Sequence, residues 1–172
     1  PTTPLDLFEN PLGTDGFEFV EFTSPEPERL GALFDLMGFT AVSRHRSKNV
    51  VRYRQGDINF LLNMEPSGQP ADFREVHGPS ANAMAFRVRD AAKALALAIE
   101  RGATPVQGPV GPMELNIPAI EGIGRSNLYL VDRYGAQEIY DVDFVPIQGA
   151  AELEAERGVG LTYLDHLTHN VF

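Results

Sequence analysis

The chain has 172 residues, of which 43% are hydrophobic and 22% charged, and its formal net charge is -10 at pH 7. This balance predicts a globular protein with a substantial core, and the negative charge argues against binding to nucleic acid, which requires a basic face. The chain has no cysteine, no apolar run of about 18 residues and no signal-peptide pattern, so we exclude disulfides and thiolate metal sites and expect a cytoplasmic protein outside the membrane.

The first part of the chain predicts a strand, a helix and three further strands. An alternating pattern over 17–22 indicates the first strand. Apolar residues at helical spacing over 28–37 indicate the helix, and Gly38 is suited to a left-handed helix end. The buried stripe of this helix is expected to consist of Leu30, Leu33, Phe34 and Met37. The three strands are expected at Thr40–Arg46, Asn49–Arg54 and Asp57–Met64, and the basic stretch 44–48 between two of them is interpreted as a solvated hairpin end.

The same order of elements recurs 64 residues later, where 102–106 matches 38–42 and the helical pattern of 92–101 matches that of 28–37. A strand over 83–88 precedes this second helix. The later strands of the second copy are expected at Thr104–Val110, at Glu114–Ile120 with Asn127–Val131, and at Glu138–Val145. A duplicated β-α-β-β-β unit predicts an α+β fold with two tandem modules whose sheets join into one curved half-barrel.

Two helix-prone linkers, Asp72–His77 and Ala150–Glu156, connect these parts. The segment from Leu161 onward is rich in Thr, Tyr and Leu and predicts the first strand of a third module. The expected organisation is an N-terminal domain over 1–148 (modules about 15–70 and 80–147), a linker over 149–160, and the truncated start of a further domain over 161–172.

The four histidines are the main candidates for a metal site. We expect His45 to be exposed and idle, and His77 to cap the short helix before a Gly-Pro turn. His166 and His169 are three residues apart, a spacing that shares a face on a helix. Strand side chains alternate, so on the predicted strand only one of the two histidines can face a metal.

Other catalytic patterns are weak. Asp141 and Asp143 would share one face of a strand, and we interpret them as a solvated face rather than an acid–base pair. The chain has no Gly-x-Ser-x-Gly elbow and no Walker loop, and Gly122 and Gly124 lack the spacing of a dinucleotide fingerprint.

Several longer motifs resemble the bacterial 4-hydroxyphenylpyruvate dioxygenases, a family within the vicinal oxygen chelate superfamily, over essentially the whole chain. These motifs occupy residues 9–13, 16–22, 45–50, 53–56, 77–80, 111–116 and 164–171. The resemblance implies two modules in the N-terminal half of a longer protein and two more in its C-terminal half.

In that family, Fe(II) is held in the C-terminal half by two histidines and a glutamate. The resemblance assigns His166 as the first of these histidines and implies that the other ligands and most of the substrate pocket follow Phe172. In an overlay of the modules, Glu18 and Asn82 take the place of His166 without matching histidine partners, so the first two modules are expected to hold no metal. Asp165, adjacent to His166 on a strand, is expected to point to the opposite face.

The implied activity is the Fe(II)-dependent conversion of 4-hydroxyphenylpyruvate, a 2-oxo acid, and O2 to homogentisate and CO2. The resemblance also implies a homo-oligomer, and it implies that this fragment alone is inactive and binds no cofactor. Two alternatives stay open. One is a stand-alone two-module protein that binds a small molecule in a cleft, and the other is a relative that oxidises the same substrate to a mandelate.

Overall fold

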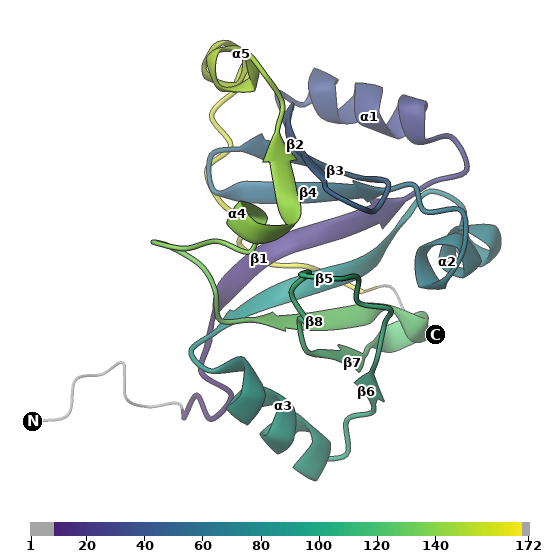
Figure 1. Ribbon diagram of the computed structural model, residues 1–172, viewed down its shortest axis with the longest axis vertical. Helices are drawn as coiled ribbons and strands as arrows, with labels where there is room; N and C mark the ends of the chain where they lie inside the picture. Colours follow the sequence, from purple (N-terminus) through teal and green to yellow (C-terminus); the bar gives the residue numbers. More distant parts are fainter. Residues whose placement is uncertain (1–8, 170–172) are drawn as a thin grey trace, which may run out of the picture.

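The computed structural model describes residues 9–169 (Figure 1). The strands are β1 (Thr14–Thr23), β2 (Thr40–His45), β3 (Val50–Gln55), β4 (Ile58–Asn63), β5 (Ser80–Val88), β6 (Pro105–Val106), β7 (Ala119–Glu121), β8 (Asn127–Val131) and β9 (Phe144–Pro146). The helices are α1 (Pro27–Leu36), α2 (Gln69–His77), α3 (Ala91–Glu100), α4 (Tyr140–Asp143) and α5 (Ala150–Arg157), with a short 3-10 helix over Ile123–Arg125. Among the helices that the structure describes, none is both long enough and apolar enough to cross a membrane.

The strands in this part of the chain form one sheet, in the order β6-β7-β8-β5-β1-β4-β3-β2-β9. In the first module (β1–β4 with α1), β4 returns to pair parallel with β1. In the second module (β5–β8 with α3), β8 pairs parallel with β5 in the same way. The modules join where β1 and β5 run antiparallel, with Val20 opposite Met84. The predicted α+β duplication with one joined sheet is confirmed.

Apolar residues cover both faces of the sheet, because neighbouring residues on a strand point to opposite sides. On one face Leu62 of β4 packs with Phe34 of α1, and Leu130 of β8 packs with Ala94 of α3. These two helices lie at opposite ends of the molecule (Figure 1). On the other face Leu61 packs with a separate cluster that includes Phe19, Val50, Ala85, Val131, Ile139 and Tyr140.

The buried stripe of α1 is narrower than predicted. Leu33 and Met37 are 49% and 39% exposed, whereas Phe34 is buried. The reason is the close approach of the helix to the sheet at Gly31, where an added Cβ would lie 2.7 Å from the hydroxyl of Tyr53. The helix therefore faces the sheet along Gly31 and Phe34, and its far side turns away from the core.

The predicted strand over Glu138–Val145 is wrong for most of its length, because only its last two residues lie in a strand, β9. Residues 140–143 form α4, because Tyr140 is buried in the core cluster and turns the chain there. The following strand β9 pairs antiparallel with β2 of the first module, with Ser43 opposite Pro146. The fourth strand of the second module is β8. The tail of the second module therefore extends the sheet at the edge of the first.

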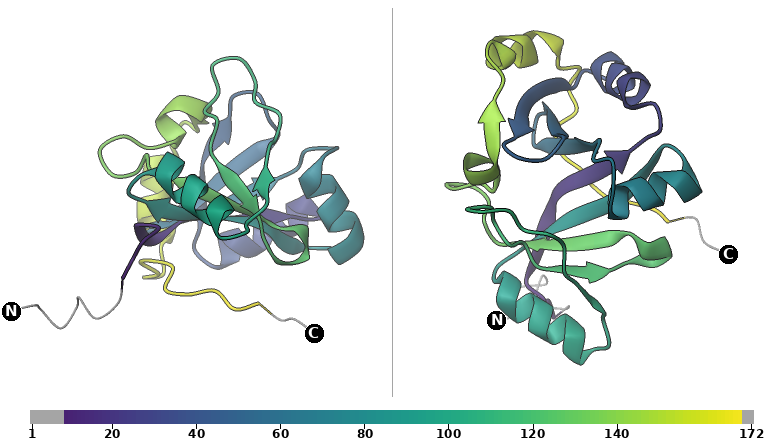
Figure 2. Two further views of the ribbon diagram at one scale, coloured as in Figure 1. Left: turned by 90° about the horizontal axis from the view of Figure 1, so that it is seen from below. Right: turned by 45° about the vertical axis from the view of Figure 1, so that its right-hand side comes forward.

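The predicted strand over Thr104–Val110 is also wrong for most of its length, because only β6 forms there. Prolines lack the N–H that a strand donates to its ladder, and the following stretch carries Pro109, Pro112 and Pro118. Residues 107–118 instead form a long loop, the β6–β7 loop, which stands out from the sheet in Figure 2 (left).

The predicted strand from Leu161 is not formed over residues 161–169, and residues 170–172 lie outside the described part. A strand requires a neighbouring strand to complete its ladder. The backbone hydrogen bond found for this segment runs from the N–H of Asp57 to the carbonyl of Thr162, at 2.7 Å. The segment is therefore an extended chain without sheet pairing. The two linker helices were predicted correctly, as α2 and α5.

Candidate functional site

The C-terminal segment, residues 158–169, carries the predicted metal ligand. In Figure 2 (left) it runs as a yellow trace along the side of the molecule away from the β6–β7 loop. Gln55 at the end of β3 holds its beginning: the side-chain oxygen accepts hydrogen bonds from the N–H of Val159 at 2.7 Å and of Leu161 at 3.3 Å. Further along, Leu164 packs against the cluster under α1. The first module thus fixes the path that leads to His166.

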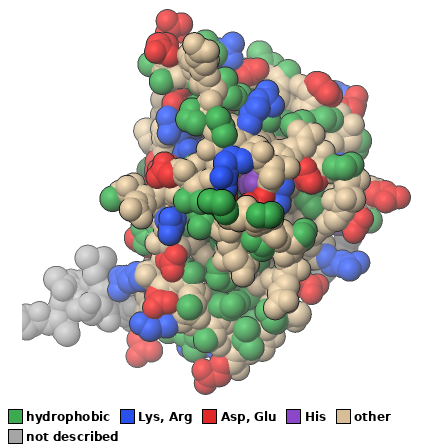
Figure 3. Space-filling model, in the orientation of Figure 1, with side chains coloured by type: hydrophobic (Ala, Val, Ile, Leu, Met, Phe, Trp, Pro, Cys, Tyr) green, Lys and Arg blue, Asp and Glu red, His purple; other side chains and the backbone are tan. Residues whose placement is uncertain are grey.

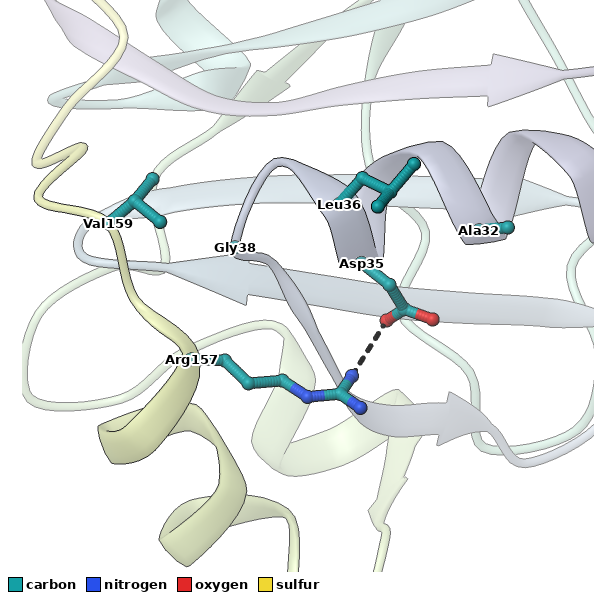
Figure 4. Close-up of a pocket in the computed structure, with 6 residues that line it drawn as sticks. All are labelled: Ala32, Asp35, Leu36, Gly38, Arg157 and Val159. Atoms are coloured by element: carbon teal, nitrogen blue, oxygen red, sulfur yellow. Dashed lines mark hydrogen bonds and ion pairs between the residues drawn. The ribbon is translucent and has the colours of Figure 1, made fainter.

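Ion pairs fasten the helix before this segment to the first module. Figure 4 shows Arg157 reaching Asp35 at the end of α1, at 3.1 Å, beside a shallow depression. Both side chains are about half exposed, so this pair contributes little to stability. Arg54 holds Glu154 through two hydrogen bonds of 2.6 Å and is less exposed. The bidentate pair is the stronger of the two attachments.

His166 lies at the surface, with a side chain that is 75% exposed. Its Nδ1 lies 2.8 Å from the Asp165 carboxylate, so the expectation that Asp165 points away is wrong. Alternation requires a pleated strand, and this segment has no ladder to impose the pleat. His169 is exposed as well.

The described residues do not fit a complete iron site. A mononuclear site of this type requires two histidines and a carboxylate on one metal. Within residues 9–169 there is no group of three or more histidines, aspartates or glutamates placed to hold a metal ion. In the C-terminal segment, the described chain supplies the imidazole of His166 and the carboxylate of the neighbouring Asp165.

Glu18, a predicted counterpart of His166, takes part in an ion-pair network. Its carboxylate accepts a hydrogen bond from Nε of Arg87 at 2.6 Å, and its side chain is only 1% exposed. Burial raises the pKa of Glu18, and Arg87 opposes that rise. Arg87 also binds both oxygens of Asp57, at 3.0 and 3.1 Å. Because the N–H of Asp57 holds Thr162, this network connects the second module to the C-terminal segment.

Asn82, the other predicted counterpart, donates its side-chain amide to Glu21 at 2.7 Å and to Gln69 at 3.0 Å. Glu21 also accepts from the amide of Asn63 at 3.2 Å. Sequence reasoning did not single out Glu21. The available signal was an acidic residue between the apolar side chains of the predicted first strand.

A cavity of about 380 Å³ lies on the sheet face that carries Phe19 and Leu61. Figure 3 shows this side of the molecule, with a histidine and several lysine and arginine side chains near its centre. Glu21 and Tyr129 lie along its sheet side, and the β6–β7 loop contributes Leu115 from the opposite side. The two modules and this loop therefore enclose space for a small molecule.

His45 lines this cavity and is half-buried, so the expectation that it is exposed is wrong. Its Nδ1 accepts hydrogen bonds from the N–H groups of Ser47 and Lys48, at 3.2 and 3.1 Å, and its ring meets the edge of Phe144. Burial, followed by the charge of Lys48, lowers the pKa of His45. His77 does not form the predicted cap: the N–H of Gly78 closes that helix end, and the His77 ring packs on Phe73.

Asp143 is not part of a solvated face, because its side chain is buried. It accepts a hydrogen bond from the N–H of Leu115 at 3.2 Å and thereby holds the β6–β7 loop. Asp141 accepts from the N–H of Glu138, at the start of α4. The two carboxylates therefore have separate structural roles.

The basic stretch 44–48 also holds the β6–β7 loop and is not a free hairpin end. Glu114 of this loop accepts hydrogen bonds from the Ser47 hydroxyl and from the N–H of Gly111, and it pairs with Lys48 at 3.1 Å. Arg46 donates to the carbonyl of Met113 at 3.0 Å. These contacts close the loop over the cavity.

The attachment of this loop should depend on pH. The hydrogen bond from Ser47 is the main cause that lowers the pKa of Glu114 from 4.5 to about 2. Because the pKa of Glu114 is lowered in the folded state, its ionised carboxylate stabilises the attachment above pH 4.5. This stabilisation is lost as the pH falls toward about 2. We expect the amide signals of the non-proline residues in 109–115 to shift and broaden in that window, measured by NMR. In Glu114→Gln this pH dependence should disappear, and an unchanged transition in that variant would assign it to another group.

Comparison with known proteins relates the chain to one family by sequence. Residues 8–145 match the family described as hydroxyphenylpyruvate dioxygenase, HPPD, N-terminal. The chain is 53% identical to a 4-hydroxyphenylpyruvate dioxygenase of Pseudomonas sp. (strain P.J. 874), over 97% of this chain and 46% of that protein. It is 56% identical to hemolysin VllY of Vibrio vulnificus (strain CMCP6), over 94% of this chain and 46% of that protein. The chain therefore spans about half the length of the curated relatives it matches.

Comparison of structures gives the same relationship. A solved protein described as a xylose isomerase-like TIM barrel/4-hydroxyphenylpyruvate dioxygenase fusion protein superposes with a TM-score of 0.70 and 42% sequence identity. The superposition covers 87% of this chain and 24% of that one. The two-module sheet described above is therefore similar to one unit of a larger protein.

Proposed function

Because the chain belongs to the family of hydroxyphenylpyruvate dioxygenase N-terminal domains, we propose that it is the N-terminal part of a non-haem Fe(II) 4-hydroxyphenylpyruvate dioxygenase. The observation that carries this proposal is the 53% identity to a Pseudomonas protein of that name over 97% of the chain. The proposed reaction converts 4-hydroxyphenylpyruvate and O2 to homogentisate and CO2, within tyrosine catabolism. When bound, iron would supply the activation of oxygen.

The proposed organisation is a non-catalytic domain over 1–148, a linker over 149–160 and the start of the catalytic domain over 161–172. In this organisation the first two modules are a scaffold that presents His166 to the rest of the protein. A cytoplasmic location and a homo-oligomeric assembly belong to the same proposal and rest on the family. We propose that the fragment alone binds no iron.

We propose His166 as one of the three iron ligands. Its exposed ring allows groups from elsewhere in the protein to reach the same metal. The Asp165 carboxylate lies at hydrogen-bond distance from Nδ1. A proton on Nδ1 would then leave Nε2 free for the metal, the arrangement in which a carboxylate orients a metal-bound histidine. Asp165 is thus a positioning residue for His166.

His166→Ala should abolish iron binding in the protein that contains both halves. We expect Fe(II) affinity and turnover to fall by more than about 100-fold, since losing a ligand exceeds the effect of losing a residue that only orients one. The melting temperature of the metal-free protein should stay unchanged because the side chain is exposed. His169→Ala is the matched control and should keep both properties. Equal losses in the two variants would contradict the assignment of His166 alone.

The activity itself is tested with the full-length product of the gene that encodes this chain. With Fe(II), O2 and 4-hydroxyphenylpyruvate, we expect homogentisate and CO2 in equal amounts, identified by chromatography. Residues 1–172 alone should give no turnover. Formation of a 4-hydroxymandelate instead of homogentisate would establish the alternative oxidation, and turnover by the fragment would overturn the proposed division of the site.

A further inference from the structure

The cavity between the sheet and the β6–β7 loop has the size and wall chemistry of a small-molecule site. Its volume of about 380 Å³ falls in the range of ligand pockets. Phe19 and Tyr129 supply aromatic surface, and Asn63 and Asn127 supply amide groups beside Glu21. A few polar groups among apolar and aromatic walls are typical of pockets that orient one ligand.

The carboxyl group of Glu21 is incompletely satisfied by the protein. The residue is 8% exposed and lines the cavity. Its Oε1 accepts hydrogen bonds from Asn82 and Asn63. Within residues 9–169, no hydrogen bond reaches Oε2, and no lysine, arginine or histidine lies within ion-pair distance of the carboxyl group. Because Oε1 already accepts two hydrogen bonds and Glu21 lines the cavity, Oε2 is the oxygen available to a ligand there.

Glu18, three residues earlier on the same strand, shows how the protein treats a buried carboxylate that it satisfies itself. Glu18 pairs with Arg87 at 2.6 Å. At Glu21 no cation of the described residues lies within ion-pair distance; burial raises the pKa of the carboxyl group, and the hydrogen bonds from Asn82 and Asn63 and the more distant charge of Lys48 oppose that rise. A buried carboxylate is stable when a cation and hydrogen-bond donors accompany it. A ligand that carries a cation would therefore complete the environment of Glu21.

The charges at the rim also favour a cation over an anion. Glu65 lines the cavity without an ion pair among the described residues, whereas Asp143 lies 4.0 Å from Arg46 and Lys48 pairs with Glu114 at 3.1 Å. An acidic ligand would meet the Glu65 carboxylate in addition to that of Glu21, whereas a cation would be attracted by both. Tyr129 also lines the cavity, and an aromatic ring attracts a cation at its face.

We propose that this cavity binds a small single-ring aromatic amine, with its ammonium group on the Glu21 carboxylate and its ring against Phe19 and Tyr129. The site is distinct from the proposed iron site. His166 does not line the cavity, and its segment runs on the side of the molecule away from the loop that closes the cavity (Figure 2). The two sites also differ in the charge of their ligands, because the cavity would bind a cation whereas the substrate of the proposed oxidation is an acid.

The test titrates the chain with benzylamine, followed by calorimetry and by NMR. We expect one molecule bound per chain, with the largest amide shifts at Glu21, Asn63, Asn127 and Tyr129. Benzyl alcohol, which has nearly the same shape without the charge, should bind at least about tenfold more weakly. In Glu21→Gln the side-chain oxygen still accepts from Asn82 and Asn63, so the fold should persist while benzylamine affinity falls by at least about tenfold.

Glu121→Gln is the matched control, because it removes the same charge from an exposed position on β7 outside the cavity. This variant should bind benzylamine as the original chain does. The proposal is overturned if benzylamine shows no binding in the millimolar range, if Glu21→Gln binds it equally well, or if benzyl alcohol binds with the same affinity. If Glu21→Gln fails to fold, the amide shifts that benzylamine causes in the original chain test the proposal instead. Shifts confined to residues outside the cavity would reject the site.

Discussion

Arg87→Met is expected to lower the free energy of unfolding by about 3–5 kcal/mol, the range for removing one partner of a buried ion pair. The variant leaves the Glu18 carboxylate, whose side chain is 1% exposed, without its cation. Methionine preserves much of the apolar stem, so the loss reports the charge rather than the packing. Urea-induced unfolding at neutral pH measures the effect.

The double variant Glu18→Gln/Arg87→Met is the control for this interpretation. A neutral amide at position 18 removes the unpaired charge, so the double variant should recover most of the stability that the single variant loses. A loss below about 1 kcal/mol in Arg87→Met would mean that the pair behaves as a surface ion pair. Arg87→Met should also remove the ion pair with Asp57, since Arg87 binds both carboxylate oxygens of that residue.

Gly56→Ala is expected to displace the C-terminal segment from the first module. Gly56 has a φ of +58°, and an added Cβ would lie 2.6 Å from the carbonyl oxygen of Leu161 and 2.9 Å from Cα of Thr162. The backbone conformation alone costs about 1–2 kcal/mol for a residue with a side chain. The contact with Leu161 and Thr162 adds to that cost, because the backbone there must move. Hydrogen exchange at the amides of Val159 and Leu161 should accelerate.

Gly124→Ala separates the two effects. Gly124 has a similar φ of +65°, and an added Cβ would have no atom within 4 Å. This control should therefore show only the conformational cost, with unchanged exchange at Val159 and Leu161. At the iron site proposed for the full-length protein, Gly56→Ala should also weaken Fe(II) binding because His166 follows the displaced segment. Equal destabilisation by the two variants, with equal protection of Val159, would contradict the proposed contact.

The duplicated module could be predicted from the sequence because its signals are local. Gly38 and Gly102 end equivalent helices 64 residues apart, and both adopt positive φ, at 86° and 98°. Alternating strands and helical stripes depend only on neighbouring residues, so they indicated most elements of both modules. The exact burial of α1 depended on the approach of Tyr53 to Gly31, a contact between distant residues.

The elements that sequence reasoning missed are those decided by distant partners. Strand β9 forms because β2 offers a free edge about a hundred residues earlier, and no pattern within 138–145 encodes that partner. The basic stretch 44–48 has the composition of a solvated turn, yet Lys48 pairs with Glu114 of the β6–β7 loop, which lies distant in sequence. His166 was found by resemblance, and its contact with Asp165 required knowing that the segment forms no ladder.

The pairing of β9 with β2 has a consequence for how the chain folds. The first module cannot complete its outer edge until residues 144–146 have been synthesised, so β2 presents an open strand edge until then. Contacts between residues so far apart in sequence slow folding, because the intervening chain must be ordered first. We therefore expect the two modules to complete their folding together, and a chain cut between β8 and β9 to leave the edge of β2 open to pairing with another chain.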